Sequence, residues 1–147
     1  MAAAFEEAEA AAAREEVPVG AVLVDVGSGA ILARDGNRTR GNADPTAHAE
    51  VLVIRAVAAE RDAPRLPDCD LYVTLEPCAL CAAAISFARL RRVTFGAFDE
   101  KMGAVVNGPR FFEQPTCHHR PEVRGGVMAD RSADLLRRFF RARRASG

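Results

Sequence analysis

The sequence predicts a three-layer α/β domain in which a mixed sheet carries helices on both faces. Three observations support this prediction. Helical patterns and short β-branched or apolar runs alternate along the chain, which is typical of layered α/β proteins. A length of 147 residues with 49% hydrophobic residues suits a single domain, spanning 1–147, with a substantial core. The residues best suited to bind a metal fall at the expected starts of two helices, where α/β sheets commonly place ligand sites.

The first third of the chain indicates a helix, a hairpin and a loop. Residues 2–15 are rich in alanine and other good helix formers, and Pro18 follows them. The β-branched run 19–26 and the short apolar run 30–33 enclose a glycine-containing turn, which favours a hairpin. Residues 36–46 are rich in Gly, Asn, Asp and Pro, and they predict a loop.

A second helix is expected to begin at the Asp-Pro-Thr sequence of residues 44–46 and to run to about residue 60. His48 and Glu50 then fall in its first turn. Residues two apart on a helix point to roughly opposite sides. Both residues can therefore serve one site only if that site lies off the end of the helix, where the helix dipole also favours hydroxide and carboxylate.

The remaining elements follow from similar patterns. We expect strands at 70–75, 92–97 and 122–124, and helices at 78–89 and 129–144. Cys78 and Cys81, three positions apart, would share one face of the first turn of their helix. The last helix has an apolar stripe that includes Phe139 and Phe140. Their rings either pack in the core or offer a stacking platform.

One histidine and two cysteines form the most specific motif in the chain. His48, Cys78 and Cys81 offer three ligands that suit zinc, and three protein ligands plus a water form the catalytic arrangement of this metal. The order His-x-Glu, then 26 residues, then Pro-Cys-x-x-Cys resembles the signature of zinc-dependent nucleobase and nucleoside deaminases. The expected cofactor is one Zn²⁺ per subunit.

The chemistry expected of this motif needs proton transfer as well as a metal. Two thiolates and a neutral imidazole roughly neutralise Zn²⁺, which lowers the pKa of a bound water toward ~7, so that hydroxide exists near neutral pH. Glu50 lies two positions from a ligand without being counted as one. We expect it to take the proton of the water and to pass it to the ring nitrogen and the leaving amine.

Over nearly its whole length the chain resembles the bacterial tRNA-specific adenosine deaminases. The resemblance rests on residues 17–22, 37–38, 44–50, 71–78, 96–99 and 139–141. It implies the cytidine deaminase-like fold, with a five-stranded sheet. It also implies conversion of adenosine to inosine at the wobble position of a tRNA anticodon, carried out by a homodimer.

The resemblance further implies roles for single residues. His48, Cys78 and Cys81 match the zinc ligands, and Glu50 matches the proton shuttle. Asn37 matches a residue that contacts the target nucleoside near its base and ribose. The substrate-binding residues expected in full are Asn37, Val19, Ala47 and Asp99.

Two loops are open to more than one interpretation. Asp99 could cap a turn instead of bordering the pocket mouth. Residues 115–120 differ from the His-containing loop of some family members, so no contact with a base is assigned to them. Cys117, His118 and His119 therefore have no assigned role, and local hydrogen bonds are the simplest expectation for the two histidines.

Charge is unevenly spread along a chain whose net charge is zero. Residues 1–16 contain five glutamates and one arginine, whereas residues 131–147 contain six arginines and one aspartate. A basic end favours a polyanionic partner, although the solvated face of a terminal helix gives the same pattern. Together with the resemblance, it indicates a face that binds the tRNA anticodon arm, and replacing Arg141, Arg143 and Arg144 with alanine should weaken that binding.

The protein is expected to be cytoplasmic. It has no run of 18 uncharged apolar residues, so no membrane span is expected, and its glutamate-containing start resembles neither a signal peptide nor a transit peptide. A reducing compartment would keep Cys69 and Cys117, which lie outside the metal motif, as free thiols.

Two other functions fit parts of the sequence. A deaminase of a free nucleobase or nucleoside, such as guanine, cytosine or adenosine, would use the same zinc chemistry. A zinc-stabilised nucleic-acid-binding module without catalysis would need a fourth ligand, and formal candidates are Cys69, Cys117, His118 and His119. That module would have no use for Glu50 beside a ligand.

Overall fold

The computed structural model describes residues 1–146, and Gly147, the last residue of the predicted domain, lies outside that range. The α-helices within it are α1 (Ala2–Ala13), α2 (Ala49–Arg61), α3 (Ala79–Phe87) and α4 (Ala129–Ser146). The strands are β1 (Gly20–Asp25), β2 (Ile31–Gly36), β3 (Cys69–Leu75), β4 (Arg92–Ala97) and β5 (Glu122–Arg124), and a short 3-10 helix covers Phe111–Glu113. Helices and strands follow one another in the expected order.

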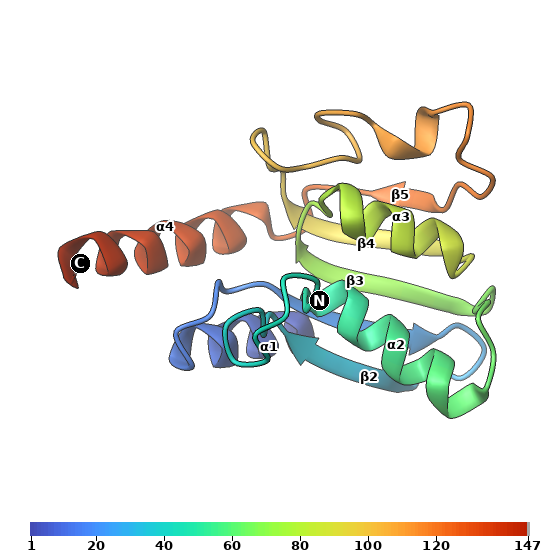
Figure 1. Cartoon of the computed structure of the whole chain (residues 1–147), viewed down its shortest axis with the longest axis horizontal. Helices are drawn as coiled ribbons and strands as arrows, with labels where there is room; N and C mark the ends of the chain where they lie inside the picture. The colour runs from blue at the N-terminus through green and yellow to red at the C-terminus, as the bar shows by residue number, and fades with distance from the viewer. Residues whose placement is uncertain (147) are drawn as a thin grey trace.

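The five strands form one mixed sheet in the order β2-β1-β3-β4-β5. Strand β1 is antiparallel to both β2 and β3, whereas β3, β4 and β5 run parallel to one another. Figure 1 shows α2 and α3 side by side in front of the sheet, with α1 behind it. The predicted three-layer α/β architecture with a mixed five-stranded sheet is therefore confirmed.

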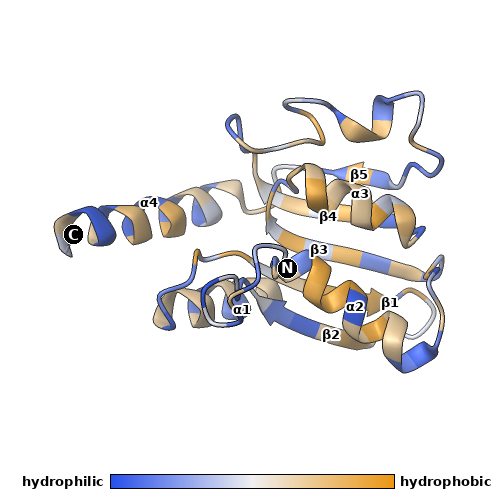
Figure 2. Cartoon of the chain, viewed as in Figure 1, coloured by the Kyte–Doolittle hydropathy of each residue, from blue (hydrophilic) through white to orange (hydrophobic). Residues whose placement is uncertain are grey.

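The core lies on the central strands, between the sheet and its helices. Strands β1, β3 and β4 are buried along most of their length, and the largest fully buried side chains include Leu23, Leu71 and Phe95. Figure 2 shows this as orange along β3 and β4, in contrast to the bluer edge strand β2. No helix within residues 1–146 is long and apolar enough to cross a membrane.

Glycine at one position lets α1 lie directly against the sheet. A Cβ atom on Gly20 would lie 1.9 Å from the carbonyl oxygen of Ala4 and 2.5 Å from the backbone nitrogen of Ala8. Only a residue without a side chain can sit at such a close approach of two backbones. The small or apolar residues on the inner side of α1, which include Phe5, are fully buried there.

The two helices that carry the metal motif begin later than the sequence predicts. Helix α2 starts at Ala49, because Asp44 and Thr46 close a separate turn in which the Thr46 N–H and hydroxyl both donate to Asp44 Oδ1, at 2.8 and 2.7 Å. Helix α3 likewise starts at Ala79 rather than Cys78. His48 and Cys78 therefore stand at N-cap positions with extended backbones, not inside the helices.

Helix α4 is only partly covered by the rest of the chain. Its first half packs on β3, β4 and α1, where the Ser132 hydroxyl donates to the Thr74 carbonyl and Leu135 is buried. From Arg137 onward most side chains are exposed, and Figure 1 shows this half extending away from the sheet. The protruding half contains most of the arginines of the basic C-terminal stretch.

Candidate functional site

Three potential metal ligands meet where α2 and α3 begin. The Nδ1 atom of His48 lies 3.5 Å from Sγ of Cys78 and 3.4 Å from Sγ of Cys81. The ligand atoms of all three residues lie within 4.8 Å of one another, close enough to share one ion. His48 ends the loop before α2, and Cys78 follows β3, so the amino ends of two adjacent helices create the group.

The chemistry of these donors fits zinc. One imidazole and two thiols are the borderline and soft ligands that this metal selects. The contact with the Cys81 thiol, aided by His48, lowers the pKa of the Cys78 thiol to about 4. The same contact, together with burial, raises the pKa of Cys81. A metal that displaces the remaining proton would hold both sulfurs as thiolates.

Glu50 lies beside this group but does not belong to it. It sits in the first turn of α2 with only 4% of its surface exposed, and it lines the same cleft as His48 and Cys78. Burial raises the pKa of its carboxyl, since a buried carboxylate loses its hydration. A carboxyl with a raised pKa is suited to accept and donate protons near neutral pH.

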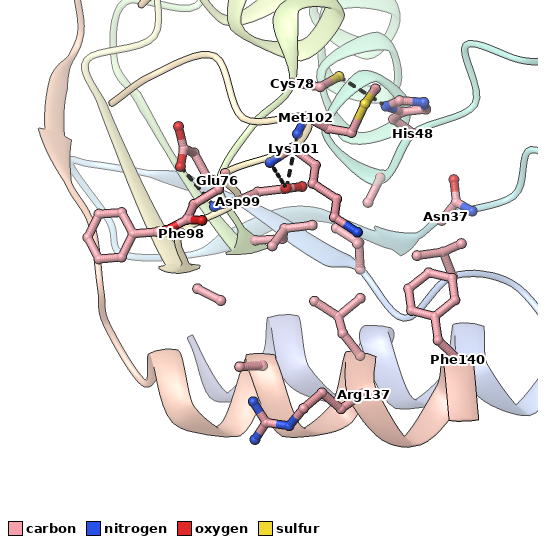
Figure 3. Close-up of a pocket in the computed structure, with 18 of the residues that line it drawn as sticks. Asn37, His48, Glu76, Cys78, Phe98, Asp99, Lys101, Met102, Arg137 and Phe140 are labelled. Carbon is pink, nitrogen blue, oxygen red and sulfur yellow. Dashed lines mark hydrogen bonds between the residues drawn. The ribbon is translucent and has the colours of Figure 1, made fainter. Parts of the chain in front are cut away.

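Two of the ligands, His48 and Cys78, line a cleft of about 1020 Å³ between the starts of α2 and α3 and the exposed part of α4, whereas Cys81 is fully buried. Figure 3 shows Asn37, His48 and Cys78 on one side and α4 along the other. The cleft brings together three of the four expected substrate-binding residues, namely Asn37, Val19 and Asp99. Ala47 does not line the cleft and is fully buried, so its expected substrate contact finds no support in this geometry.

Asn37 is held in place by its backbone. Its N–H donates to the Val19 carbonyl at 3.0 Å, and its own carbonyl accepts a hydrogen bond from Arg14 at 3.2 Å. Its side-chain nitrogen donates to Thr39 Oγ1 at 3.4 Å. The side-chain amide of Asn37 is therefore held at the wall of the cleft, while its Oδ1 atom accepts no hydrogen bond from residues 1–146.

Asp99 has the turn-capping role that the sequence left open, and it also lines the cleft. Its Oδ1 atom accepts the N–H groups of Lys101 and Met102 at 3.1 and 3.0 Å. These bonds, drawn in Figure 3, order the turn that begins just after β4. Turn capping and pocket lining are thus compatible at this position.

Several lining residues were not singled out from the sequence. Lys101 and Met102 come from an irregular stretch without hydrophobic periodicity, which gave no signal except that Lys101 is the only lysine. Phe140 is 41% exposed and lines the cleft, so it is not a core residue. Figure 3 shows its ring rising from α4 on the side where Asn37 lies.

The arginines of α4 divide between two faces of the helix. Arg137, Arg141 and Arg144 line the cleft. Arg143 instead lies over the ring of Phe139, 5.5 Å from its centre. The sequence-based choice of arginines for RNA binding therefore included one that lies off the cleft and omitted Arg137.

The remaining thiols and histidines lie outside the metal group. Cys117 donates to the His119 carbonyl at 3.1 Å, and its sulfur lies 3.5 Å from the Ser86 hydroxyl. The His119 ring nitrogen lies 2.7 Å from the Leu90 carbonyl. These contacts hold the loop of residues 115–120 against the end of α3. Within residues 1–146 no fourth Cys or His joins the metal group, which disfavours a closed structural zinc site.

Comparisons with known proteins agree with this geometry. The family model described as the cytidine and deoxycytidylate deaminase zinc-binding region matches residues 1–97, which contain all three candidate ligands and Glu50. A tRNA-specific adenosine deaminase from Agrobacterium fabrum is 57% identical over 144 residues, which cover 98% of this chain and 93% of that protein. One from Haemophilus influenzae is 43% identical over 141 residues, which cover 96% and 81%.

Solved structures show the same relationship. A structure from a study of A-to-I editing by tRNA:A34 deaminases at the wobble position of transfer RNA has a TM-score of 0.89 and 57% identity, covering 92% of this chain and 97% of that one. A guanine deaminase from Bacillus subtilis has a TM-score of 0.62 and 30% identity, covering 92% and 88%. The fold is thus cytidine deaminase-like, and the chain belongs to the family of tRNA-specific adenosine deaminases, zinc-dependent enzymes that share the cytidine and deoxycytidylate deaminase zinc-binding region.

Proposed function

We propose that the protein deaminates adenosine to inosine at the wobble position of a tRNA anticodon. The observation that carries this proposal is one cleft that borders the His/Cys/Cys group through His48 and Cys78 and that also contains the buried Glu50 carboxyl and a row of arginines on α4. The similarity to proteins named tRNA-specific adenosine deaminases supports the same conclusion.

Metal binding and proton transfer are carried out by different residues of the site. His48, Cys78 and Cys81 would hold one Zn²⁺, which when bound supplies an activated water for attack on the base. Glu50 takes a proton from the attacking water. It delivers this proton to the ring nitrogen of the base, then takes the proton of the new hydroxyl group on C6 and passes it to the amine, which leaves as ammonia. The burial that raises the pKa of Glu50 favours both halves of this transfer.

Substrate recognition has to reach a base that is normally stacked in the anticodon. Such a base must be splayed out of the loop before its C6 carbon can be attacked. The cleft has a volume of about 1020 Å³, which leaves room for a base, and Asn37, Val19 and Asp99 lie along its walls. Arg137, Arg141 and Arg144 lie farther along the same cleft, where the phosphates of flanking nucleotides would pass.

The alternative is a deaminase of a free nucleobase or nucleoside, and the similarity to a guanine deaminase shows that the same fold serves such substrates. The arginines of α4 favour the tRNA substrate. A free base carries no phosphate, so a small-molecule enzyme gains nothing from three arginines beside its pocket.

Inosine formation tests the proposal directly. The zinc-loaded protein should convert adenosine to inosine in an unmodified tRNA pool and in an anticodon stem-loop, with far slower turnover of free adenosine, guanine and cytosine. Digestion to nucleosides followed by mass spectrometry detects the product. Faster turnover of a free base or nucleoside than of the stem-loop would contradict the proposal.

We further propose that the protein acts in the cytoplasm as a homodimer, and that residues 1–147 of each subunit form a single deaminase domain. An apolar surface supports the homodimer. Leu80 and Phe87, seven residues apart on α3, are exposed on one side of the helix, with Phe87 at 74%. Val106, in the neighbouring loop, is also exposed. A second copy of the chain would cover such a surface.

A further inference from the structure

The carboxylate of Glu76 is the acceptor for five hydrogen bonds. Its Oε1 atom accepts the Asp99 N–H at 3.0 Å and the Asn107 side-chain amide at 2.7 Å. Its Oε2 atom accepts three consecutive backbone N–H groups, those of Val105, Val106 and Asn107, at 3.1, 3.0 and 3.1 Å. Only 2% of Glu76 is exposed, so these donors take the place of water around a buried charge.

All five donors belong to one segment, residues 98–107, which we call the cleft loop. This loop follows β4 and supplies Asp99, Lys101 and Met102 to the wall of the cleft. Figure 3 shows Glu76 beside Asp99, with its bond to the Asp99 backbone, and Glu76 is itself one of the residues that border the cleft. Within residues 1–146, one side chain outside the loop, that of Glu76 directly after β3, accepts hydrogen bonds from both ends of the cleft loop.

The same anchor connects the cleft loop to the metal ligands. Glu76 lies two residues before Cys78, at the junction of β3 and α3. The Ala104 N–H donates to the Pro77 carbonyl at 2.9 Å, and Gly103 pairs with Cys78 as an isolated antiparallel bridge. The loop is thus held in register with the segment that supplies a ligand.

The number and direction of the donors require a carboxylate. Two carboxylate oxygens provide about four lone-pair sites, twice as many as one amide oxygen, and the five N–H donors share them. A glutamine of the same shape would keep one oxygen but turn an NH₂ group toward N–H groups that need an acceptor. Backbone N–H groups that lose their acceptor in a buried setting are costly, so the loop would move away instead of staying in place.

Close packing at Gly103 is a second, independent sign of this arrangement. A Cβ atom on Gly103 would lie 2.5 Å from Cδ and 2.6 Å from Oε2 of Glu76, and 2.4 Å from the Asp99 carbonyl oxygen. Any side chain at position 103 would therefore push the cleft loop off the carboxylate.

We propose that Glu76 is a positioning residue, whose carboxylate keeps the cleft loop in a preformed shape so that Asp99, Lys101 and Met102 meet the RNA substrate without further ordering. The contact of the cleft loop with RNA rests on the proposed function, whereas the anchoring of the loop by Glu76 does not. Glu76 itself does not act on the reacting base. Its loss should weaken substrate binding, because binding would then include the cost of ordering the loop.

Glu76→Gln, Glu76→Asp and Gly103→Ala test the proposal, with Glu60→Gln as a matched control at an exposed position at the end of α2. In Glu76→Gln, amide hydrogen exchange of residues 98–107 should accelerate about tenfold or more, because hydrogen bonds to a charged acceptor are lost. Zinc should stay at about one ion per chain, as the ligand atoms are unchanged. The KM for an anticodon stem-loop should rise about tenfold while kcat changes by less than about threefold.

The other variants separate charge from shape. Glu76→Asp keeps the negative charge on a side chain that is one methylene group shorter. Its amide hydrogen exchange in the cleft loop and its KM should both lie between those of wild type and of Glu76→Gln. Gly103→Ala keeps the carboxylate and should reproduce the exchange and KM changes of Glu76→Gln, which also covers the case that Glu76→Gln fails to fold. Wild-type exchange of the loop in both Glu76→Gln and Gly103→Ala would overturn the proposal, and so would loss of kcat with KM unchanged.

The outcomes also distinguish this inference from the proposed function. If the wild-type protein does not deaminate the stem-loop, the proposed function fails, and hydrogen exchange still decides whether Glu76 anchors the loop. If Glu76→Gln releases zinc, Glu76 is part of the support of the metal site, and the positioning role assigned to it is wrong.

Discussion

The Nδ1 atom of His48 lies 3.4 Å from the sulfur of Cys81, although 33 residues separate them in the chain. The contact forms because α2 and α3 pack side by side and begin close together. Each helix start offers an orphan set of N–H groups and a positive dipole end, which favour thiolate, hydroxide and carboxylate. The position of the metal group therefore follows from the packing of two helices on one face of the sheet.

Removing a ligand should abolish metal binding without unfolding the protein. In Cys81→Ala we expect zinc and deamination to be lost, because two remaining ligands hold zinc poorly. The core on β1, β3 and β4 does not depend on the ion, so far-UV circular dichroism should stay close to that of wild type. Chelation of the wild-type protein should give the same result. Unfolding on chelation would instead assign the zinc a structural role.

Glu50→Ala should separate metal binding from proton transfer. We expect zinc to remain at about one ion per chain and deamination to fall by roughly 10²–10⁴-fold or more, because a positioned general acid–base is lost. Elemental analysis and inosine formation measure the two effects. Glu60→Ala, at an exposed position on the same helix, is the matched control. Loss of zinc from Glu50→Ala would place Glu50 among the ligands.

The arginines that line the cleft should bind the phosphates of the RNA. Replacing Arg137, Arg141 and Arg144 with alanine should weaken binding of an anticodon stem-loop and flatten its salt dependence, by roughly one unit of slope per lost phosphate contact. Fluorescence anisotropy across a salt series measures both. The paired change of Arg138 and Arg143, on the same helix but off the cleft, should have a smaller effect. Equal effects of the two sets would mean that only net charge matters.

The apolar surface on α3 should mediate assembly. Light scattering at micromolar concentration should give twice the monomer mass for the wild-type protein. Phe87→Asp should give the monomer mass, since a charge buried in an apolar interface lacks a partner. The same change of an exposed residue away from this surface, Val26→Asp, should leave the mass unchanged. A wild-type monomer would refute the homodimer.

Gly20→Ala should destabilise the fold at the contact of α1 with β1. The added Cβ would overlap the backbone of α1, so we expect a loss of about 2 kcal/mol or more in the free energy of unfolding. Gly27→Ala is the control, because a Cβ atom there meets only the Asp25 carboxylate at 3.6 Å. Denaturant titration of both variants measures the difference. Equal stabilities would show that α1 can shift without cost.

Much of this fold could be predicted from local patterns in the sequence. Strands β4 and β5 have the bounds that the sequence predicts, and for β4 the reason is a β-branched and apolar run between turn residues, which leaves few alternatives. The His/Cys/Cys set and Glu50 were readable from residue type and spacing alone, since few other chemistries use these residues in this order. Similarity to relatives of known name then supported the reaction class.

Tertiary structure decided the rest. The turn that delays the start of α2 depends on a side-chain hydrogen bond, which competes with the helix in a way that propensities do not capture. The burial of Ala47 and the split of the α4 arginines between two faces depend on which neighbours pack against each element. The cleft loop has no periodicity at all. Its shape depends on the buried Glu76 carboxylate, which its five N–H donors reach only in the folded chain. The sequence by itself therefore determined which chemical groups form the site, whereas the packing of the folded chain determined the walls of the cleft.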